Sequence, residues 1–291
     1  MSGSELGGGQ ELGIAVVHHR TPAGLLGEAH SRLQKAAPRA GIVLVDSGGP
    51  GAAEPLDLPP AVEVLEVSNH SYSHAVNRGL ERLEQPFLVL MNADVLVEGD
   101  TFERLMQAAR RDPKAGVVGP LALNRAGRPQ DLGLPYRLAY AAAARAGAAG
   151  APVSWLSGCL QLIDRRLWLE LGGYDESLRF TNEDLEFCLR ARRAGWICRL
   201  ASAPVVHIGG TSTPSHPAFH VEGRRGGYLL SQRYRSPAEA FLHRGFLRAE
   251  ALLGSLVARD ESARASHRAM QRLLDDGDWQ RSPFGATLDD R

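Results

Sequence analysis

Short apolar runs alternate with amphipathic segments along the first part of the chain. Five runs bounded by Gly, Pro or Asp have the length of buried strands, at residues 14–17, 42–45, 62–67, 87–91 and 117–118. Segments between them have apolar positions at helical spacing, at residues 23–36, 74–83 and 101–111, with Asp100 as the expected N-cap of the last. This alternation predicts a mainly parallel sheet with crossover helices.

A second block of elements is predicted after residue 150. The expected elements are a strand at 155–163, a short helix at 165–171, a helix at 183–194 stopped by Gly195, and strands at 196–201 and 205–208. Beyond residue 222 the pattern is helical, with a capping box at Ser236 and Glu239 and another helix at 262–274. The Ala-, Gly- and Arg-rich stretch at 125–152 is either an ordered surface excursion or a mobile flap.

These elements indicate an α/β fold with a Rossmann-like central sheet flanked by helices and a C-terminal helical extension. We expect a flexible Gly-rich tail at 1–12, an α/β domain at 13–221 with halves 13–120 and 121–221, and a helical region at 222–291.

The charge balance argues against nucleic-acid binding, and the cysteine content indicates a reducing compartment. Lys plus Arg and Asp plus Glu number 33 each, so no global positive field attracts nucleic acid. The three cysteines form no close metal-ligand pair, and a sparse, odd number is typical of a reducing compartment. The first residues lack the pattern of a signal peptide, and no apolar stretch reaches the ~20 residues of a membrane span. We expect a cytoplasmic protein, with any membrane contact peripheral and at the inner face.

Two carboxylates follow predicted strands directly. Asp46 follows the run at 42–45, and Asn92 and Asp94 follow the run at 87–91. Ligands of parallel α/β sheets gather at the carboxyl ends of the strands, where a carboxylate can bind Mg²⁺ or Mn²⁺ together with substrate phosphates. Asp94 is therefore a candidate metal ligand, and its alternative role is to cap the following turn.

Three further candidates lie in the second block. Glu183 and Asp184 open a predicted helix, where acids are ordinary partners of the helix dipole, but a loop position would also let one of them act as a general base. His207 ends an apolar strand before two glycines, and is either a structural residue or a contact to metal or phosphate.

Taken together, these blocks resemble the inverting family 2 glycosyltransferases of the GT-A fold, especially their rhamnosyltransferase-like branch. The resemblance covers roughly residues 13–234. Its nucleotide half rests on the motifs at 14–17, 45–47, 69–72, 77–79 and 92–94. Its acceptor half rests on those at 155–159, 172–176, 180–184, 190–196 and 206–207.

The resemblance implies roles for individual residues. Asp184 would be the catalytic base, with Glu183 as the second candidate, and Asp94 with His207 would hold a divalent cation, Mn²⁺ or Mg²⁺. The residues implied to bind the nucleotide sugar are Asp46, Asn69, Asn77, Asn92 and Asp94. The residues implied to bind the acceptor are Trp155, Ser157 and Gly158.

The chain departs from the family pattern at three places, all in the nucleotide half. Ser47-Gly48-Gly49 stands where Asn-Gly-Ser is common, Ser71 where Gly is usual, and His18-His19-Arg20 where Thr-Tyr-Asn is typical. These departures bear on the contacts to the donor and leave the expected reaction unchanged.

The implied activity is single-displacement transfer of a sugar from a nucleotide diphosphate donor to a glycan or lipid-linked acceptor, in polysaccharide or glycolipid synthesis. A dTDP- or UDP-linked donor is favoured and a GDP-linked donor is the alternative. Two other functions stay open: a nucleotidyltransferase, for whose phosphate loop residues 16–26 offer only Arg20 and Gly24, and a non-catalytic nucleotide-sugar-binding protein.

The C-terminal helices are predicted to carry a cluster of arginines among apolar residues. Two uses of this surface remain open: docking on a membrane face, or packing on the core or in a homodimer. The arginines are Arg233, Arg235, Arg244 and Arg248.

Overall fold

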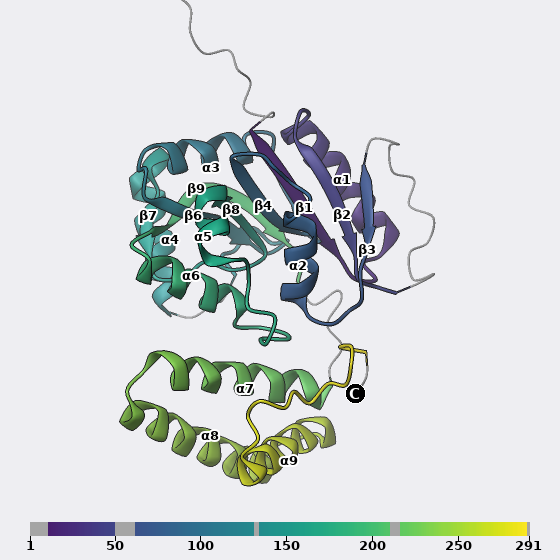
Figure 1. Ribbon diagram of the computed structural model, residues 1–291, viewed down its shortest axis with the longest axis vertical. Coiled ribbons are helices and arrows are strands. Elements are labelled where there is room, and N and C mark those ends of the chain that lie inside the picture. The colour runs from purple at the N-terminus through teal and green to yellow at the C-terminus, as the bar shows by residue number, and fades with distance from the viewer. Residues whose placement is uncertain (1–10, 50–61, 131–133, 210–215, 290–291) are drawn as a thin grey trace, which may run out of the picture. The chain divides into compact units, whose positions relative to one another are not determined.

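The computed structural model describes residues 11–49, 62–130, 134–209 and 216–289 (Figure 1). Most of the predicted tail at 1–12 lies outside the described residues. The chain divides into two compact units. The sheet unit comprises Met1–Ser68, Ala75–Tyr174 and Phe187–Ser212, and the helical unit comprises Asn69–His74, Asp175–Glu186 and Thr213–Arg291.

The sheet unit contains a mixed sheet of nine strands among the described residues, in the order β3-β2-β1-β4-β8-β6-β9-β5, with β7 paired to β9. The pairs β1 with β2, β1 with β4, β2 with β3 and β6 with β9 are parallel. Strand β8 is antiparallel to both β4 and β6, and strands β5 and β7 are antiparallel to β9. The α/β fold class predicted from the apolar runs is confirmed. The strands are β1 Leu12–His18, β2 Gly41–Asp46, β3 Glu63–Glu66, β4 Phe87–Asn92, β5 Val95–Leu96, β6 Ala115–Leu123, β7 Ala151–Val153, β8 Leu160–Asp164 and β9 Ile197–His207.

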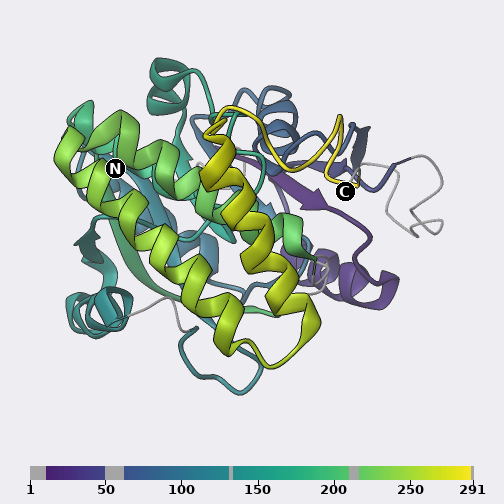
Figure 2. The ribbon, with the colours of Figure 1, turned by 90° about the horizontal axis from the view of Figure 1, so that it is seen from below.

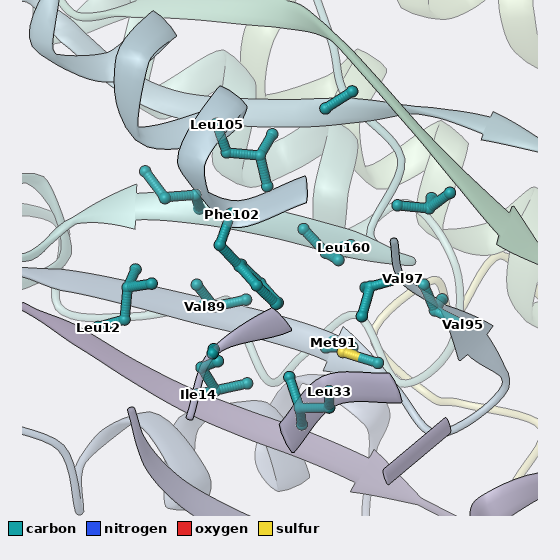
Figure 3. Packing of buried hydrophobic residues seen from close by; sticks show 14 of the residues in the cluster. Leu12, Ile14, Leu33, Val89, Met91, Val95, Val97, Phe102, Leu105 and Leu160 are labelled. Carbon is teal, nitrogen blue, oxygen red and sulfur yellow. The ribbon is translucent and has the colours of Figure 1, made fainter. Parts of the chain in front are cut away.

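Helices cover both faces of this sheet (Figure 1). On one face α1 (Ala23–Ala36) and α3 (Thr101–Arg110) bury their apolar sides against β1, β4 and β8, and Figure 3 shows side chains such as Leu33 and Phe102 meeting the strand residues there. The other face carries α5 (Arg165–Leu171) and the parts of α2 (Tyr72–Leu80) and α6 (Glu183–Arg193) that belong to the sheet unit.

Close packing on the second face requires a glycine in α2. A Cβ atom on Gly79 would lie 2.5 Å from Cγ2 of Val45 and 2.9 Å from Cβ of Ala15. Because real Cβ atoms do not approach so closely, any larger residue at position 79 would push α2 away from β1 and β2.

The stretch at 125–152, predicted as either an excursion or a flap, contains regular structure where it is described. It includes α4 (Leu134–Ala146), a 3₁₀ turn at Gly147–Ala149 and β7. Tyr140 of α4 is buried and its hydroxyl donates to the carbonyl of Ala122 in β6, so the helix is tied to the sheet.

Three sequence-based expectations need correction. The strand predicted at 155–163 begins only at Leu160, because the preceding residues form a turn in which the carbonyl of Leu156 accepts from the Gln161 side chain instead of a strand partner. The two strands predicted at 196–201 and 205–208 are one strand, β9, in which Pro204 is tolerated beside a register shift in the pairing with β6. Asp100 takes the N-cap position of α3, but its carboxylate pairs with Arg104 instead of capping.

The helical unit contains three long helices, α7 (Pro217–Tyr234), α8 (Pro237–Val257) and α9 (Glu261–Asp276), which Figure 2 shows side by side. The capping box predicted at the start of α8 is present, since the Ser236 hydroxyl accepts from the Glu239 N–H and the Glu239 carboxylate accepts from the Ser236 N–H. Within the described ranges, none of the helices combines the length and the apolar content that crossing a bilayer requires. The core of the unit is formed by Leu178, Val221, Tyr228, Leu229, Leu230, Leu247, Ala251, Met270, Leu274 and Trp279.

A fully buried ion pair lies inside this unit. Glu222 and Arg225, both on α7, have side chains that are 0% and 2% exposed. The Glu222 carboxylate also accepts from the backbone N–H of Arg179, and the Arg225 guanidinium also donates to the carbonyls of Ser177 and Trp279. Such a pair is stable only when its remaining donors and acceptors are satisfied. It therefore links α7 to the segment before α6 and to the C-terminal segment.

Removing one member of this pair should destabilise the helical unit strongly. Arg225→Met would leave the Glu222 carboxylate buried without its cation, and we expect a loss of about 3–5 kcal/mol in the free energy of unfolding. Arg248→Met, which breaks the exposed pair between Arg248 and Asp275, is the matched control and should change it by less than about 1 kcal/mol. Urea unfolding followed by circular dichroism measures both. Equal, small effects would contradict the structural role of the buried pair.

Candidate active site

Several predicted site residues converge at one edge of the sheet. Asp46 ends β2 and is in register with His18 at the end of β1, while Asn92 ends β4 beside Val17. Because β8 is antiparallel to both β4 and β6, and β6 is parallel to β9, strand β9 runs in the same direction as β4. His207, the last residue of β9, is therefore at this same carboxyl edge.

Asp46 is almost fully buried at the end of β2. Its carboxylate accepts from the N–H of Gly48 at 2.8 Å, so one oxygen shapes the loop that follows. The neighbouring His18 is also buried, and burial lowers the pKa of its imidazole although the nearby Asp46 carboxylate opposes this shift. His18 is thus neutral at physiological pH and adds no positive charge to this edge of the sheet.

Asp94 and His207 form the most specific arrangement at this edge. Nε2 of His207 lies 3.4 Å from Oδ1 of Asp94. The other carboxylate oxygen, Oδ2, accepts from the N–H of Gly209 at 3.1 Å, and the Asp94 carbonyl accepts from the N–H of Ile208. These backbone bonds, together with the pairing of Val95 with His207 between β5 and β9, hold the two side chains face to face.

The tautomer of His207 follows from its contact with Gln130. The Gln130 amide nitrogen donates to the carbonyl of His207 at 3.0 Å, and a carbonyl can only accept. The amide oxygen of Gln130 must then face Nδ1 of His207, which lies 3.0 Å away, so Nδ1 carries the hydrogen. In the neutral ring, Nε2 is left with its lone pair directed at Asp94.

This donor pair fits a divalent cation. A carboxylate oxygen and an imidazole nitrogen lone pair point at the same space, and both have one side already fixed by hydrogen bonds, as metal ligands commonly do. Among the described residues no group of three or more His, Cys, Asp or Glu side chains gathers as a metal site. Mg²⁺ and Mn²⁺ sites in which substrate phosphates complete the coordination need only one or two protein ligands.

The predicted acceptor residues lie in the turn that precedes β8. The N–H of Asn92 donates to the carbonyl of Cys159 at 2.9 Å, which places the turn beside the end of β4. Trp155 and Ser157 are partly exposed there, and Gly158 is buried. The structure therefore brings these three residues to the same sheet edge as Asp94.

Two residues predicted to bind nucleotide have other contacts. Both ends of the buried Asn77 amide bond the backbone of Tyr174, with distances of 3.0 and 2.9 Å, so this side chain fixes the segment after α5. Asn69 belongs to the helical unit, where its amide donates to the Asp289 carboxylate and its carbonyl accepts from the N–H of Leu288. Sequence position alone did not indicate either contact.

Glu183 and Asp184 belong to the helical unit, at the start of α6. The two residues before them, Thr181 and Asn182, have φ angles of 64° and 69°, a left-handed conformation that is unfavourable for threonine in particular. The Asn182 amide donates to the carbonyl of Gly223 on α7 at 2.9 Å, which helps to hold this strained turn. Strain retained directly before two carboxylates is typical of functional sites.

The two carboxylates have different surroundings. Glu183 is 7% exposed, and its Oε2 has no hydrogen-bond partner among the described residues. Burial raises the pKa of Glu183 to about 8, and the negative charges of Asp184 and Glu222 act in the same direction. Asp184 is only partly buried and its Oδ1 accepts from the N–H of Leu185. At neutral pH, Glu183 holds a proton.

The helical unit also has a hollow of about 660 Å³ between the ends of α7 and α9 and the segment after α9. Its lining mixes apolar side chains such as Val221 and Leu273 with Arg272 and Asp276. None of the predicted site residues lines it, so we do not assign it to the reaction.

Comparison with known proteins shows which family the chain resembles. Residues 52–228 match the profile of a family described as "Glycosyltransferase like family 2". The chain is 29% identical over 274 residues to N-acetylglucosaminyl-diphospho-decaprenol L-rhamnosyltransferase from two strains of Mycobacterium tuberculosis, covering 80% of this chain and 88% of the relative.

Solved structures show the fold. The mannosyltransferase PcManGT from Pyrobaculum calidifontis, solved with GDP-Man and Mn²⁺, aligns with a TM-score of 0.55 at 19% identity, over 91% of this chain and 85% of that one. GalNAc-T7, solved with UDP, GalNAc and Mn²⁺, aligns with a TM-score of 0.62 at 17% identity, over 94% of this chain and 58% of that one. Both are glycosyltransferases, and the GT-A fold expected from the sequence is confirmed.

The raised pKa of Glu183 predicts a pH dependence of stability. Between pH 4.5 and about 8 the folded chain keeps this proton and the unfolded chain does not, so this group's contribution to stability falls as pH rises through that window. Glu183→Gln cannot ionise and should gain stability relative to wild type on going from about pH 5 to about pH 9. Unfolding free energies from urea titrations at both pH values measure the difference. Exposed Glu84→Gln is the control, and parallel curves for wild type and Glu183→Gln would contradict the assignment.

Proposed function

This chain belongs to glycosyltransferase family 2, and on that premise we propose that it transfers a sugar from a nucleotide diphosphate donor to a lipid-linked acceptor with inversion at the anomeric carbon. The observation that carries the proposal is the Asp94 and His207 pair at the carboxyl edge of the sheet, held at 3.4 Å with Nε2 facing the carboxylate. Such a pair suits a cation that binds the donor diphosphate.

The donor half of the site is assigned to the sheet edge. Asp94 and His207 would hold Mn²⁺ or Mg²⁺, which when bound supplies positive charge to the diphosphate as it leaves. Asp46 is placed to accept hydrogen bonds from the nucleoside, since the second oxygen of its carboxylate is not used by Gly48. Asn92 lies between them at the end of β4 and is assigned to the same ligand.

Asp184 is proposed as the general base. Glu183 retains its proton at neutral pH and is nearly inaccessible, whereas Asp184 is partly exposed and so can reach an acceptor. When adjacent carboxyl groups have separated pKa values, the ionised one is the base. Glu183 is the second candidate.

The reaction is one displacement. The acceptor oxygen forms a bond to the anomeric carbon, its proton passes to the Asp184 carboxylate, and the bond from the anomeric carbon to the diphosphate oxygen breaks. Attack opposite the leaving group inverts the anomeric centre, and no covalent sugar intermediate on the protein is required.

The substrates are proposed from the curated relative. Its name specifies an L-rhamnosyl donor and an acceptor built on diphospho-decaprenol, so a deoxyhexosyl donor linked to dTDP or UDP and a polyprenyl diphosphate sugar are our first choices. A GDP-linked donor is the alternative, because PcManGT was solved with GDP-Man. The product would then serve cell-surface polysaccharide or glycolipid synthesis at the inner face of the membrane.

Metal-dependent donor binding should require Asp94. A donor present at a hundredfold excess over its Kd stabilises the folded state by about 2.7 kcal/mol, which is several degrees in Tm. We expect one nucleoside diphosphate, or its sugar, to give this shift only with Mn²⁺ or Mg²⁺, and Asp94→Asn to abolish it. The exposed Asp100→Asn is the matched control and should shift like wild type. An unchanged metal-dependent shift in Asp94→Asn would remove this residue from the site.

Asp184 should be required for sugar transfer but not for donor binding. Asp184→Asn keeps the volume of the side chain but loses its basicity, so we expect donor-induced Tm shifts like wild type and turnover lower by ~10²–10⁴-fold. Asp276→Asn, an exposed carboxylate on α9, is the control. Release of nucleoside diphosphate measures the rate, and NMR of the product gives its anomeric configuration. If Glu183→Gln abolishes turnover and Asp184→Asn does not, the roles of the two acids are exchanged.

A further inference from the structure

The outer side of α8 is a continuous apolar surface, here called the α8 face. Its seven large side chains are between 53% and 79% exposed, which is unusual for phenylalanine and leucine in one helix. They recur at spacings of three and four residues and so lie along one side of the helix. The α8 face consists of Phe241, Leu242, Phe246, Leu252, Leu253, Leu256 and Val257.

The opposite side of α8 packs against the rest of the helical unit. Ala240, Leu247 and Ala251 are buried against the rest of the helical unit, and His243 contacts the Ser231 hydroxyl there at 2.6 Å. Helix α8 is therefore apolar on both sides. A helix of this kind is normally buried all round, so the α8 face requires a partner.

The size of the α8 face matches a protein interface. Its seven side chains expose on the order of 600 Å² of apolar surface, at the upper end of the ~300–600 Å² found for the largest patch on a monomer. A standard interface takes about 800 Å² from each partner. The polar rim of this helix would supply the remainder.

The charges around the α8 face do not suit a lipid surface. Both lysines of the chain, Lys35 and Lys114, lie in the sheet unit, and three arginines near the middle of the face make contacts within the helical unit, while Arg235 and Arg259 at the two ends of α8 are exposed. Interfacial helices, in contrast, carry free Lys or Arg that attract anionic lipids. The contacts are Arg244 to the carbonyl of Leu274, Arg248 to Asp275 and Arg224 to Glu250.

The shape of the α8 face, with small residues among large ones, suits packing against α8 of a second copy. Gly245 and Ala249 are exposed in its middle, and a Cβ atom built on Gly245 would meet no atom within 4 Å. Large side chains from a second helix can enter this shallow region, as knobs enter holes in helix pairs. The α8 face carries both the large residues and the small ones, so it can complement a copy of itself.

We propose that the α8 face is the interface of a homodimer, in which α8 of one copy packs against α8 of the other around a twofold axis. Two copies cover each other's seven large side chains and leave no apolar face exposed. The interface lies outside the residues assigned to donor binding and proton transfer.

The mass of the protein in solution tests this directly. Wild type at micromolar concentration should sediment with twice the 31.4 kDa mass of the chain. Phe246→Glu combined with Leu253→Glu places charges inside the interface and should weaken dimerisation by about a hundredfold or more, giving the monomer mass. Because both residues are exposed, the variant should keep the circular dichroism spectrum and donor-induced Tm shift of wild type.

Leu138→Glu is the matched control, since Leu138 is 65% exposed on α4 in the sheet unit. It should leave the dimer intact. A monomeric wild type overturns the proposal, and if that monomer floats with phosphatidylcholine and phosphatidylglycerol vesicles while the double variant does not, the face binds lipid. A double variant that remains dimeric overturns the proposal as well, because the interface then lies elsewhere.

Discussion

A single buried carboxylate, that of Glu222, organises the helical unit. It is satisfied by the Arg225 guanidinium, the Arg179 backbone and the Ser282 hydroxyl, which come from three separate segments of the chain. Since a buried charge is tolerated only when all of these partners are present, the segment before α6 can occupy few alternative positions. The same negative charge also contributes to the raised pKa of Glu183. The role of Glu222 is therefore mainly structural, since burial and the Asp184 charge raise the pKa of Glu183 more than Glu222 does.

The sheet edge is built by a different means, in which backbone hydrogen bonds fix the side chains. Oδ2 of Asp94 is occupied by the Gly209 N–H, and His207 is held through both its carbonyl and its Nδ1 by Gln130. These contacts direct Oδ1 of Asp94 and Nε2 of His207 towards each other, 3.4 Å apart. Under the proposed function, little reorganisation would be needed for a cation and a diphosphate to bind, which is the condition for effective electrostatic stabilisation of a leaving group.

The elements predicted correctly from the sequence are those in which a short run of apolar residues by itself indicates burial. The runs that became β1, β2 and β4 are apolar because both faces of the sheet are covered, and the carboxylates after them necessarily fall at its edge. Gln130 was missed because it lies in a polar, Gly-containing loop whose partner is 77 residues away. Glu222 and Arg225 were missed because charges on a helix are usually solvated, and only the packing of three segments shows that these are not. The exposure of the α8 face was not decided by the sequence, whose helical pattern is equally compatible with a membrane face, packing on the core or a homodimer.

The adjacent acids at the start of α6 have different surroundings, and this difference bears on the role proposed for Asp184. If both Glu183 and Asp184 were ionised, each would raise the pKa of the other, and the pair would be poorly matched to neutral pH. Burial resolves this conflict by keeping the proton on Glu183. Asp184 then lies beside a neutral neighbour and near the positive end of the α6 dipole, which favours a carboxylate. Under the proposed function, a base that is partly exposed beside a buried, neutral neighbour would take the proton of the incoming acceptor hydroxyl.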